Sequence, residues 1–256
     1  MASISYLQSS SNATGATSYT FTNRNVGPED VGRYIIIAVS ARGIATGNAV
    51  TSATIGDVTA TIIGESINSA GSTSSTTTIL LALLPTGTTA TVVVNFTVGT
   101  ARCNISMYTA TGIDPSPLSV QQSIDAAPTA SIATAINGIA LGSAMSNGDT
   151  TTTWSGLTES FDGSYGPSNA THSVATASNT SAGTLVATAT FASSQLASGI
   201  FVSWASNASS GTGGSGTIKT WNGSAWVEKP IKVWNGSAWV TKSIKVWDGS
   251  NYVTKS

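Results

Sequence analysis

The sequence predicts an all-β protein: an antiparallel β-sandwich of jelly-roll type, followed by an array of three short β-hairpins. Three observations lead to this prediction. Residues 1–207 alternate short β-forming runs with Gly, Ser, Thr and Asn clusters and lack the apolar spacing of amphipathic helices. Charged residues make up only 8% of the 256 residues, so the polar surface must consist mainly of hydroxyl and amide groups. The C-terminal segment repeats one 13-residue unit three times.

The first part of the chain is expected to form two packed layers of strands. Residues 34–39, YIIIAV, are apolar on both faces, which predicts a central strand. Val92, Val94 and Phe96 alternate along one run, and residues 103–107 continue the pattern, which predicts a meander hairpin buried on one side. Strands are expected near residues 4–7, 19–23, 33–42, 50–55, 58–64, 78–84, 89–98, 102–109, 131–141, 152–154, 172–177, 184–191 and 199–204.

Cys103 is the only cysteine, so a disulfide within the chain is excluded. It alternates with Ile105 and Met107 on the face expected to be buried. The pattern predicts a core thiol and not a nucleophile.

The C-terminal repeats read IKTWNGSAWVEKP (218–230), IKVWNGSAWVTKS (231–243) and IKVWDGSNYVTKS (244–256). Each contains an Asn-Gly or Asp-Gly pair between two β-forming runs, the strongest short-range hairpin signal. Residues 206–217, rich in Gly and Ser, are expected to be a flexible linker. The predicted organisation is therefore a sandwich over residues 1–205, a linker over 206–217 and repeats over 218–256.

Two hairpin registers are open for each repeat. A two-residue Asn235-Gly236 loop places Trp234 opposite Ser237, whereas a four-residue loop places it opposite Trp239. Either register gives an aliphatic face and an aromatic face with lysines beside it. The rings either stack within the repeats or a subunit interface, or form a platform for a sugar or receptor. The candidate assembly or binding residues are Trp221, Trp226, Trp234, Trp239, Trp247, Tyr252, Lys232 and Lys245.

Charge is distributed unevenly along the chain. Residues 1–217 carry four arginines against nine acids, a formal charge of −5. The repeats carry all six lysines against two acids, a formal charge of +4. The lysines are diluted by Trp and Val and accompanied by no arginine, so a nucleic-acid partner is not expected.

Targeting signals are not evident in the sequence. The first 15 residues lack the basic and apolar regions of a signal peptide. No apolar run is longer than residues 79–84, which are too few to span a bilayer, so membrane insertion is not expected.

Residues with catalytic or metal-binding chemistry are sparse. His172 is the only histidine and lies in an ordinary strand pattern, so a catalytic triad is not expected. One Cys and one His exclude a standard zinc site. Glu159 and Asp162 lie three residues apart, but Asp162-Gly163 is interpreted as a turn rather than as half of a glycosidase pair. Residues 147–149, NGD, lack the ligand spacing of a calcium loop. We therefore expect no enzyme activity, cofactor or metal.

Several segments resemble the β-sandwich structural proteins of tailed-phage virions. They are NVGPEDVGR (25–33) leading into the Ile/Val strand, WSGLTE (154–159), FDG (161–163), GIFVSW (199–204) and the tandem KVWNGSAWV units. The resemblance implies a virion component made in the host cytoplasm, with tail, fibre and head-decoration positions all open. It further implies assembly of copies of the chain, as a trimer, and contacts with other virion proteins. The alternative is an adhesin whose repeats bind a host-surface glycan.

Overall fold

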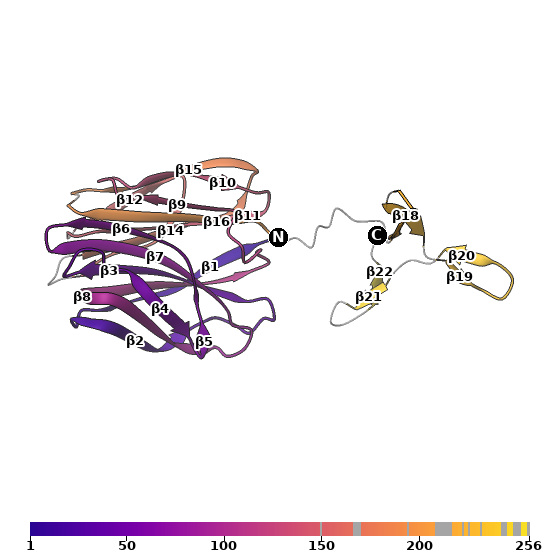
Figure 1. The fold of residues 1–256 in the computed structure, drawn as a ribbon, viewed down its shortest axis with the longest axis horizontal. Helices are drawn as coiled ribbons and strands as arrows, with labels where there is room; N and C mark the ends of the chain where they lie inside the picture. Colours follow the sequence, from indigo (N-terminus) through magenta and orange to yellow (C-terminus); the bar gives the residue numbers. More distant parts are fainter. Residues whose placement is uncertain are drawn as a thin grey trace. The chain divides into compact units, whose positions relative to one another are not determined.

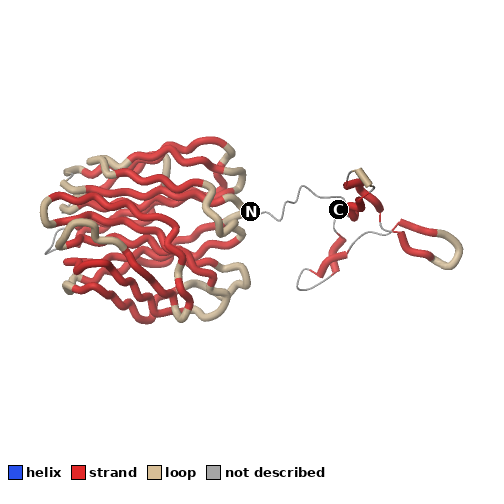
Figure 2. Tube along the Cα trace, viewed as in Figure 1, coloured by secondary structure: helices blue, strands red, loops and turns tan. Residues whose placement is uncertain are grey.

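The computed structural model describes residues 1–148, 150–165, 170–193, 195–207, 217–221, 223–224, 226–230, 232–241, 245–247 and 252–254. All regular elements among these residues are β-strands, and the pairs that form their sheets are antiparallel (Figures 1 and 2). The predicted all-β antiparallel fold class is confirmed. The chain divides into two compact units, Met1–Ala208 and Ser209–Ser256.

The described residues of the first unit form three sheets. An eight-stranded sheet comprises β1 (Ser3–Asn12), β2 (Ala16–Asn25), β3 (Tyr34–Gly43), β4 (Val50–Ile55), β5 (Val58–Thr59), β6 (Thr61–Ala70), β7 (Thr73–Leu83) and β8 (Thr89–Thr111). A five-stranded sheet has the order β13 (Thr158–Tyr165), β14 (Ala170–Thr180), β11 (Gly138–Ser146), β16 (Ala197–Trp204) and β9 (Ser119–Ser123). A three-stranded sheet has the order β10 (Thr129–Thr134), β15 (Gly183–Phe191) and β12 (Thr152–Ser155).

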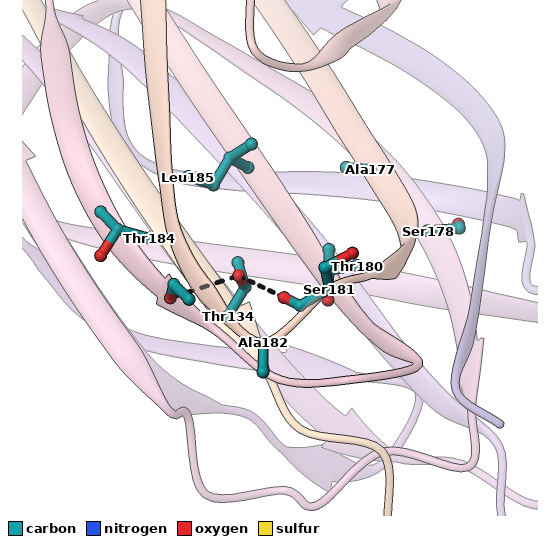
Figure 3. A pocket seen from close by; sticks show the side chains of 9 residues that line it. Thr134, Ala177, Ser178, Thr180, Ser181, Ala182, Thr184 and Leu185 are labelled. Carbon is teal, nitrogen blue, oxygen red and sulfur yellow. Dashed lines mark hydrogen bonds between the residues drawn. The ribbon is translucent and has the colours of Figure 1, made fainter.

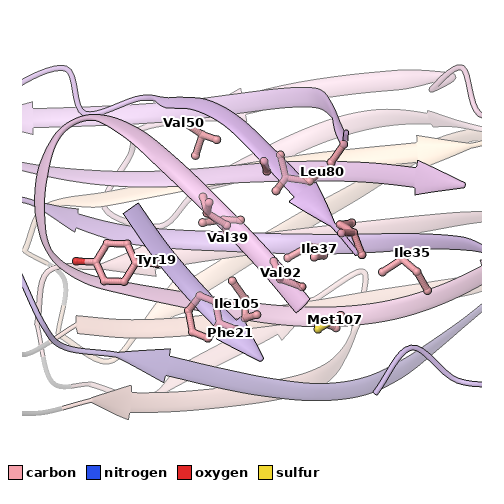
Figure 4. Packing of buried hydrophobic residues seen from close by; sticks show 14 of the residues in the cluster. Tyr19, Phe21, Ile35, Ile37, Val39, Val50, Leu80, Val92, Ile105 and Met107 are labelled. Atoms are coloured by element: carbon pink, nitrogen blue, oxygen red, sulfur yellow. The ribbon is translucent and has the colours of Figure 1, made fainter. Parts of the chain in front are cut away.

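Strand β8 replaces the expected meander hairpin. It is one continuous strand of 23 residues, not two strands joined by a turn. Its first half pairs with β2 and β4, and its second half pairs with β1 and β3. The positions that face the first core change from even to odd numbers between Phe96 and Cys103, where the pairing registers shift. The eight-stranded sheet therefore folds over on itself, and both halves of β8 face one hydrophobic core (Figure 4).

The strands of the first unit stack in four layers rather than the expected two. The folded eight-stranded sheet encloses the first core, which contains Phe21, Ile37 and Val92. A second core lies between this sheet and the five-stranded sheet, and it contains Ile36, Leu141 and Trp204. A third core joins the five-stranded and three-stranded sheets through apolar residues that include Ile132, Ala175 and Phe201. The two inner layers are therefore covered on both sides, which stabilises the unit by burying apolar surface.

The prediction of a central strand over residues 34–39 is confirmed. Strand β3 pairs with β7 on one side and with β8 on the other. Ile35, Ile37 and Val39 pack in the first core, whereas Ile36 and Ala38 pack in the second. The apolar run is therefore buried on both faces, as the sequence indicates.

Cys103 is fully buried in the first core, and burial raises the pKa of its thiol. We expect the thiol to remain unmodified by a maleimide under native conditions and to react once the chain is unfolded. Labelling followed by intact mass measurement checks this. A Ser131→Cys variant, which adds a thiol at an exposed position of β10, serves as the control and should gain one rapid label. Rapid double labelling of that variant would show that Cys103 is accessible.

The described residues of the second unit form three two-stranded hairpins, one in each repeat. They are β17 (Thr217–Trp221) with β18 (Trp226–Pro230), β19 (Lys232–Trp234) with β20 (Trp239–Thr241), and β21 (Lys245–Trp247) with β22 (Tyr252–Thr254). Ser206 forms a bridge with Ile113, and the Asn207 amide donates to the Gly112 carbonyl, so both belong to the first unit. Most of the expected linker, residues 208–216, lies outside the described residues.

Candidate functional site: the tryptophan hairpins

The hairpins adopt the second of the two registers considered above, with a four-residue loop. Trp234 lies opposite Trp239, and Trp221 lies opposite Trp226. In the third repeat the corresponding pair is Trp247 and Tyr252. The register thus places an aromatic pair at the same position of every hairpin, next to the turn.

An Asn side chain organises the turn of the middle repeat. The backbone amide of Asn235 donates to the Ala238 carbonyl at 3.0 Å and closes the loop. The Asn235 Oδ1 atom accepts from the backbone amides of Ser237 at 2.9 Å and Ala238 at 2.8 Å. Gly236 has φ of +101°, a conformation that favours glycine. The Asn-Gly sequence therefore specifies the loop that brings the two tryptophans together.

Aromatic and basic side chains share one face of the middle hairpin. Because side chains alternate along a strand, Lys232, Trp234, Trp239 and Thr241 lie on one face and Val233 on the other. The centroids of the two indole rings are 5.8 Å apart, and the rings are inclined at 59°. This spacing lies in the range of favourable aromatic pairs.

Three indole rings of the repeats are described, and all three are accessible within the chain. Trp234 is 52% exposed and Trp239 is 65% exposed, and Trp221 in the first repeat is 56% exposed. The pairing across strands therefore orients the rings without burying them. The candidate side chains of Trp226, Lys245, Trp247 and Tyr252 lie outside the described side chains, although their backbones form the paired strands.

His172 is a buried structural residue in β14, and its surroundings were not evident from the sequence. Its Nδ1 atom lies 2.6 Å from Ser40 Oγ in β3, and its Nε2 atom lies 2.7 Å from Ser106 Oγ in β8. Ser106 Oγ lies in turn 2.6 Å from Ser9 Oγ in β1. Burial lowers the pKa of His172 to about 3, so the imidazole is neutral at pH 7. The network joins the eight-stranded and five-stranded sheets, and His172, Ser40 and Ser106 are fully buried, whereas Ser9 is partly exposed.

Glu159 and Asp162 lie in different environments. The interpretation of Asp162-Gly163 as a turn is wrong, because both residues lie within a strand. Both carboxylates belong to β13, and Asp162 pairs with Ser173 within the sheet. Asp162 Oδ2 accepts from the Thr152 amide at 2.9 Å and so ties β12 to β13. Glu159 is exposed, and its pKa is raised by desolvation and by the nearby Asp162 charge. Asp162 is thus engaged in a structural hydrogen bond.

A metal site is not indicated by the described residues. Asn147 is buried, and its Nδ2 atom donates to the Ser74 carbonyl at 3.3 Å, while Asp149 lies outside the described residues. No group of three or more His, Cys, Asp or Glu side chains that could hold an ion occurs among the described residues.

A hollow of about 260 Å³ lies beside the β14–β15 turn (Figure 3). Its lining is Thr134, Ala177, Ser178, Thr180, Ser181, Ala182, Gly183, Thr184 and Leu185. Thr134 Oγ1 donates to the Ser181 carbonyl at 2.7 Å, and Thr180 Oγ1 donates to the Ala135 carbonyl at 2.6 Å. These two hydroxyls hold the turn in place, and the lining has no ionisable side chain for acid–base chemistry.

Among the described residues, the structure contains no helix long and apolar enough to cross a membrane. Comparisons of the chain with protein-family models, with curated proteins and with solved structures find no match. The strongest candidate for a functional surface is the tryptophan–lysine face of the middle hairpin, because Lys232, Trp234 and Trp239 are exposed together on it.

Proposed function

We propose that the protein is a structural component of a tailed-phage virion that acts through assembly and surface interactions, without catalysis. In this proposal the layered unit forms the body of the component, and copies of the chain assemble about a threefold axis. The hairpin repeats serve as the element that docks to another surface. Tail, fibre and capsid-decoration positions are all compatible with this role.

The observation that carries the proposal is the division of the chain into a compact, layered body with few charged residues and a repeated aromatic element. Extensive burial on both faces of the inner strands gives the body stability without a disulfide. Hairpins of this size have little independent core, so repetition favours binding or assembly over catalysis. The phage-like segments in the sequence support the same role.

Removal of residues 211–256 tests this assignment of roles. We expect the shortened chain to remain soluble and all-β by far-UV circular dichroism, because its cores do not include the repeats. We also expect it to lose attachment to virion particles in a sedimentation assay in which the full chain co-sediments. Equal co-sedimentation of both chains would show that the repeats are not the docking element. Unfolding of the shortened chain would contradict the independence of the body.

A second candidate function is recognition of a host-surface glycan by the repeats. The exposure of Trp221, Trp234 and Trp239, each more than half accessible, favours it. Indole rings exposed beside polar groups are suited to stacking on sugar rings. Both functions coexist in a receptor-binding fibre.

A further inference from the structure

The middle hairpin presents an aromatic face with a cation at its edge. Lys232 lies next to Trp234 along the same face, and Trp239 and Thr241 complete it from β20. Lys232 and both indole rings are exposed. A ligand on this face would meet two flat apolar rings, with centroids 5.8 Å apart, and the ammonium group of the same face. Such a face suits a partner that combines apolar surface with negative charge.

The charge of the repeats further restricts the partner. Six lysines against two acids give the repeats of each chain a formal charge of +4. Stacking the repeats of several copies on one another would bring like charges together, which opposes association. An anionic partner would instead be attracted to every copy. The six lysines occur as two per 13-residue unit, so the attraction is repeated along the array.

We infer that the aromatic–lysine face binds an acidic polysaccharide. The tryptophans stack on the apolar faces of sugar rings, and the lysines pair with carboxylates carried by the polymer. The other repeats keep the aromatic pair at the same register position, so the polymer meets three aromatic pairs in series. In the first repeat Glu228 lies opposite Lys219, so this repeat attracts an anionic polymer less strongly than the middle one. Linked weak sites bind a repeating polymer far more tightly than one site does. This inference rests on the proposed role of the repeats as a docking element.

The test measures binding of the full chain to polygalacturonate by isothermal titration calorimetry and by tryptophan fluorescence. We expect binding that weakens as salt is raised, because exposed ion pairs are screened. Fully methyl-esterified polygalacturonate has the same sugar rings without the charges, and polyacrylate has the charges without the rings. Both should bind at least about tenfold more weakly, since each lacks half of the recognised chemistry and the loss is multiplied along the array.

Variants of the middle repeat test whether this face is responsible. Trp234→Ala with Trp239→Ala should weaken binding by about tenfold through the lost valency, and Lys232→Gln should reduce both affinity and salt dependence. Val233→Thr, on the opposite face of the same strand, is the matched control and should bind as the parent does.

Three outcomes would overturn the inference. They are absence of binding to polygalacturonate, equal binding to polyacrylate, or tighter binding to vesicles of anionic lipid than to the polymer. Co-sedimentation with virion particles, measured on the same variants, separates the inference from the proposed function. If the polymer does not bind while particle attachment persists, the docking role stands and its sugar partner is wrong. If polymer binding and particle attachment are both lost on deletion of the repeats but persist in the face variants, the aromatic–lysine face is not the binding surface.

Discussion

Replacing Arg33 with methionine is expected to lower the free energy of unfolding by about 3–5 kcal/mol. The Arg33 guanidinium is buried and donates five hydrogen bonds to backbone carbonyls at 2.6–2.8 Å. The acceptors belong to Gly27, Pro28, Leu84, Thr86 and Gly87. A single side chain thus ties together the loop before β3 and the loop before β8. Methionine fills part of the volume but leaves all five carbonyls without this donor.

Urea unfolding followed by circular dichroism measures the effect. Arg24→Met is the matched control, because Arg24 is only partly buried and bonds Thr22 and Ser10 at the surface. Its expected loss is at most about 1 kcal/mol. Arg33→Lys should recover little of the stability, because an ammonium group cannot reproduce the planar array of donors. A loss below about 1 kcal/mol for Arg33→Met would contradict the role assigned to this side chain.

Acidification is expected to destabilise the first unit through His172. In the unfolded chain its imidazole protonates near the ordinary pKa of about 6.5, whereas burial holds the folded pKa at about 3. Between these values the unfolded state binds more protons, so stability falls as the pH falls. The contribution is about 1.4 kcal/mol per pH unit, and on the order of 5 kcal/mol over the whole interval. Stability is unaffected by this group above about pH 7.

His172→Gln isolates this effect, because glutamine is neutral and can still donate to and accept from Ser40 and Ser106. Its unfolding free energy should change less between pH 7 and pH 4 than that of the parent chain. The comparison is needed because Glu65 acts in the opposite direction: burial raises its pKa, so the folded state binds more protons near and above pH 4.5. Identical pH profiles for parent and variant would show that His172 is not held neutral in the folded state.

The sequence predicted the strands best where apolar residues recur with period two or cover both faces. The central position of the run from Tyr34 to Val39 was predicted because the run has no polar face that could lie against solvent. The stacking in four layers was not predicted, because β7 begins with the polar run TSSTTT, which is typical of an exposed segment. Its Ser75 and Thr76 are buried and hydrogen-bonded to Ser198 Oγ and to the Asn48 carbonyl. Hydroxyl groups satisfied in this way allow a polar sequence to line an interior.

Two local signals were misinterpreted for physical reasons. Asp162-Gly163 resembles a turn, but it lies in edge strand β13 two residues beyond a register shift, and edges tolerate such irregularity. The two alternating apolar runs at 92–96 and 103–107 suggested a hairpin, yet β8 runs through both as one strand. The hairpin register of the repeats remained ambiguous because both loops leave the same residues on the aromatic face. The His172 partners lie 132 and 66 residues away in sequence, beyond the reach of pattern analysis.

The proposal that the chain is a virion component is tested most directly by measuring its copy number in particles. Tailed-phage particles released from cells that carry the gene can be purified by density gradient and analysed by quantitative mass spectrometry. We predict that peptides from both the layered unit and the repeats occur in the particles in a fixed ratio to the other virion proteins. The predicted copy number is a multiple of three. Absence of the chain from purified particles, with the chain abundant in the remaining lysate, would contradict the proposal.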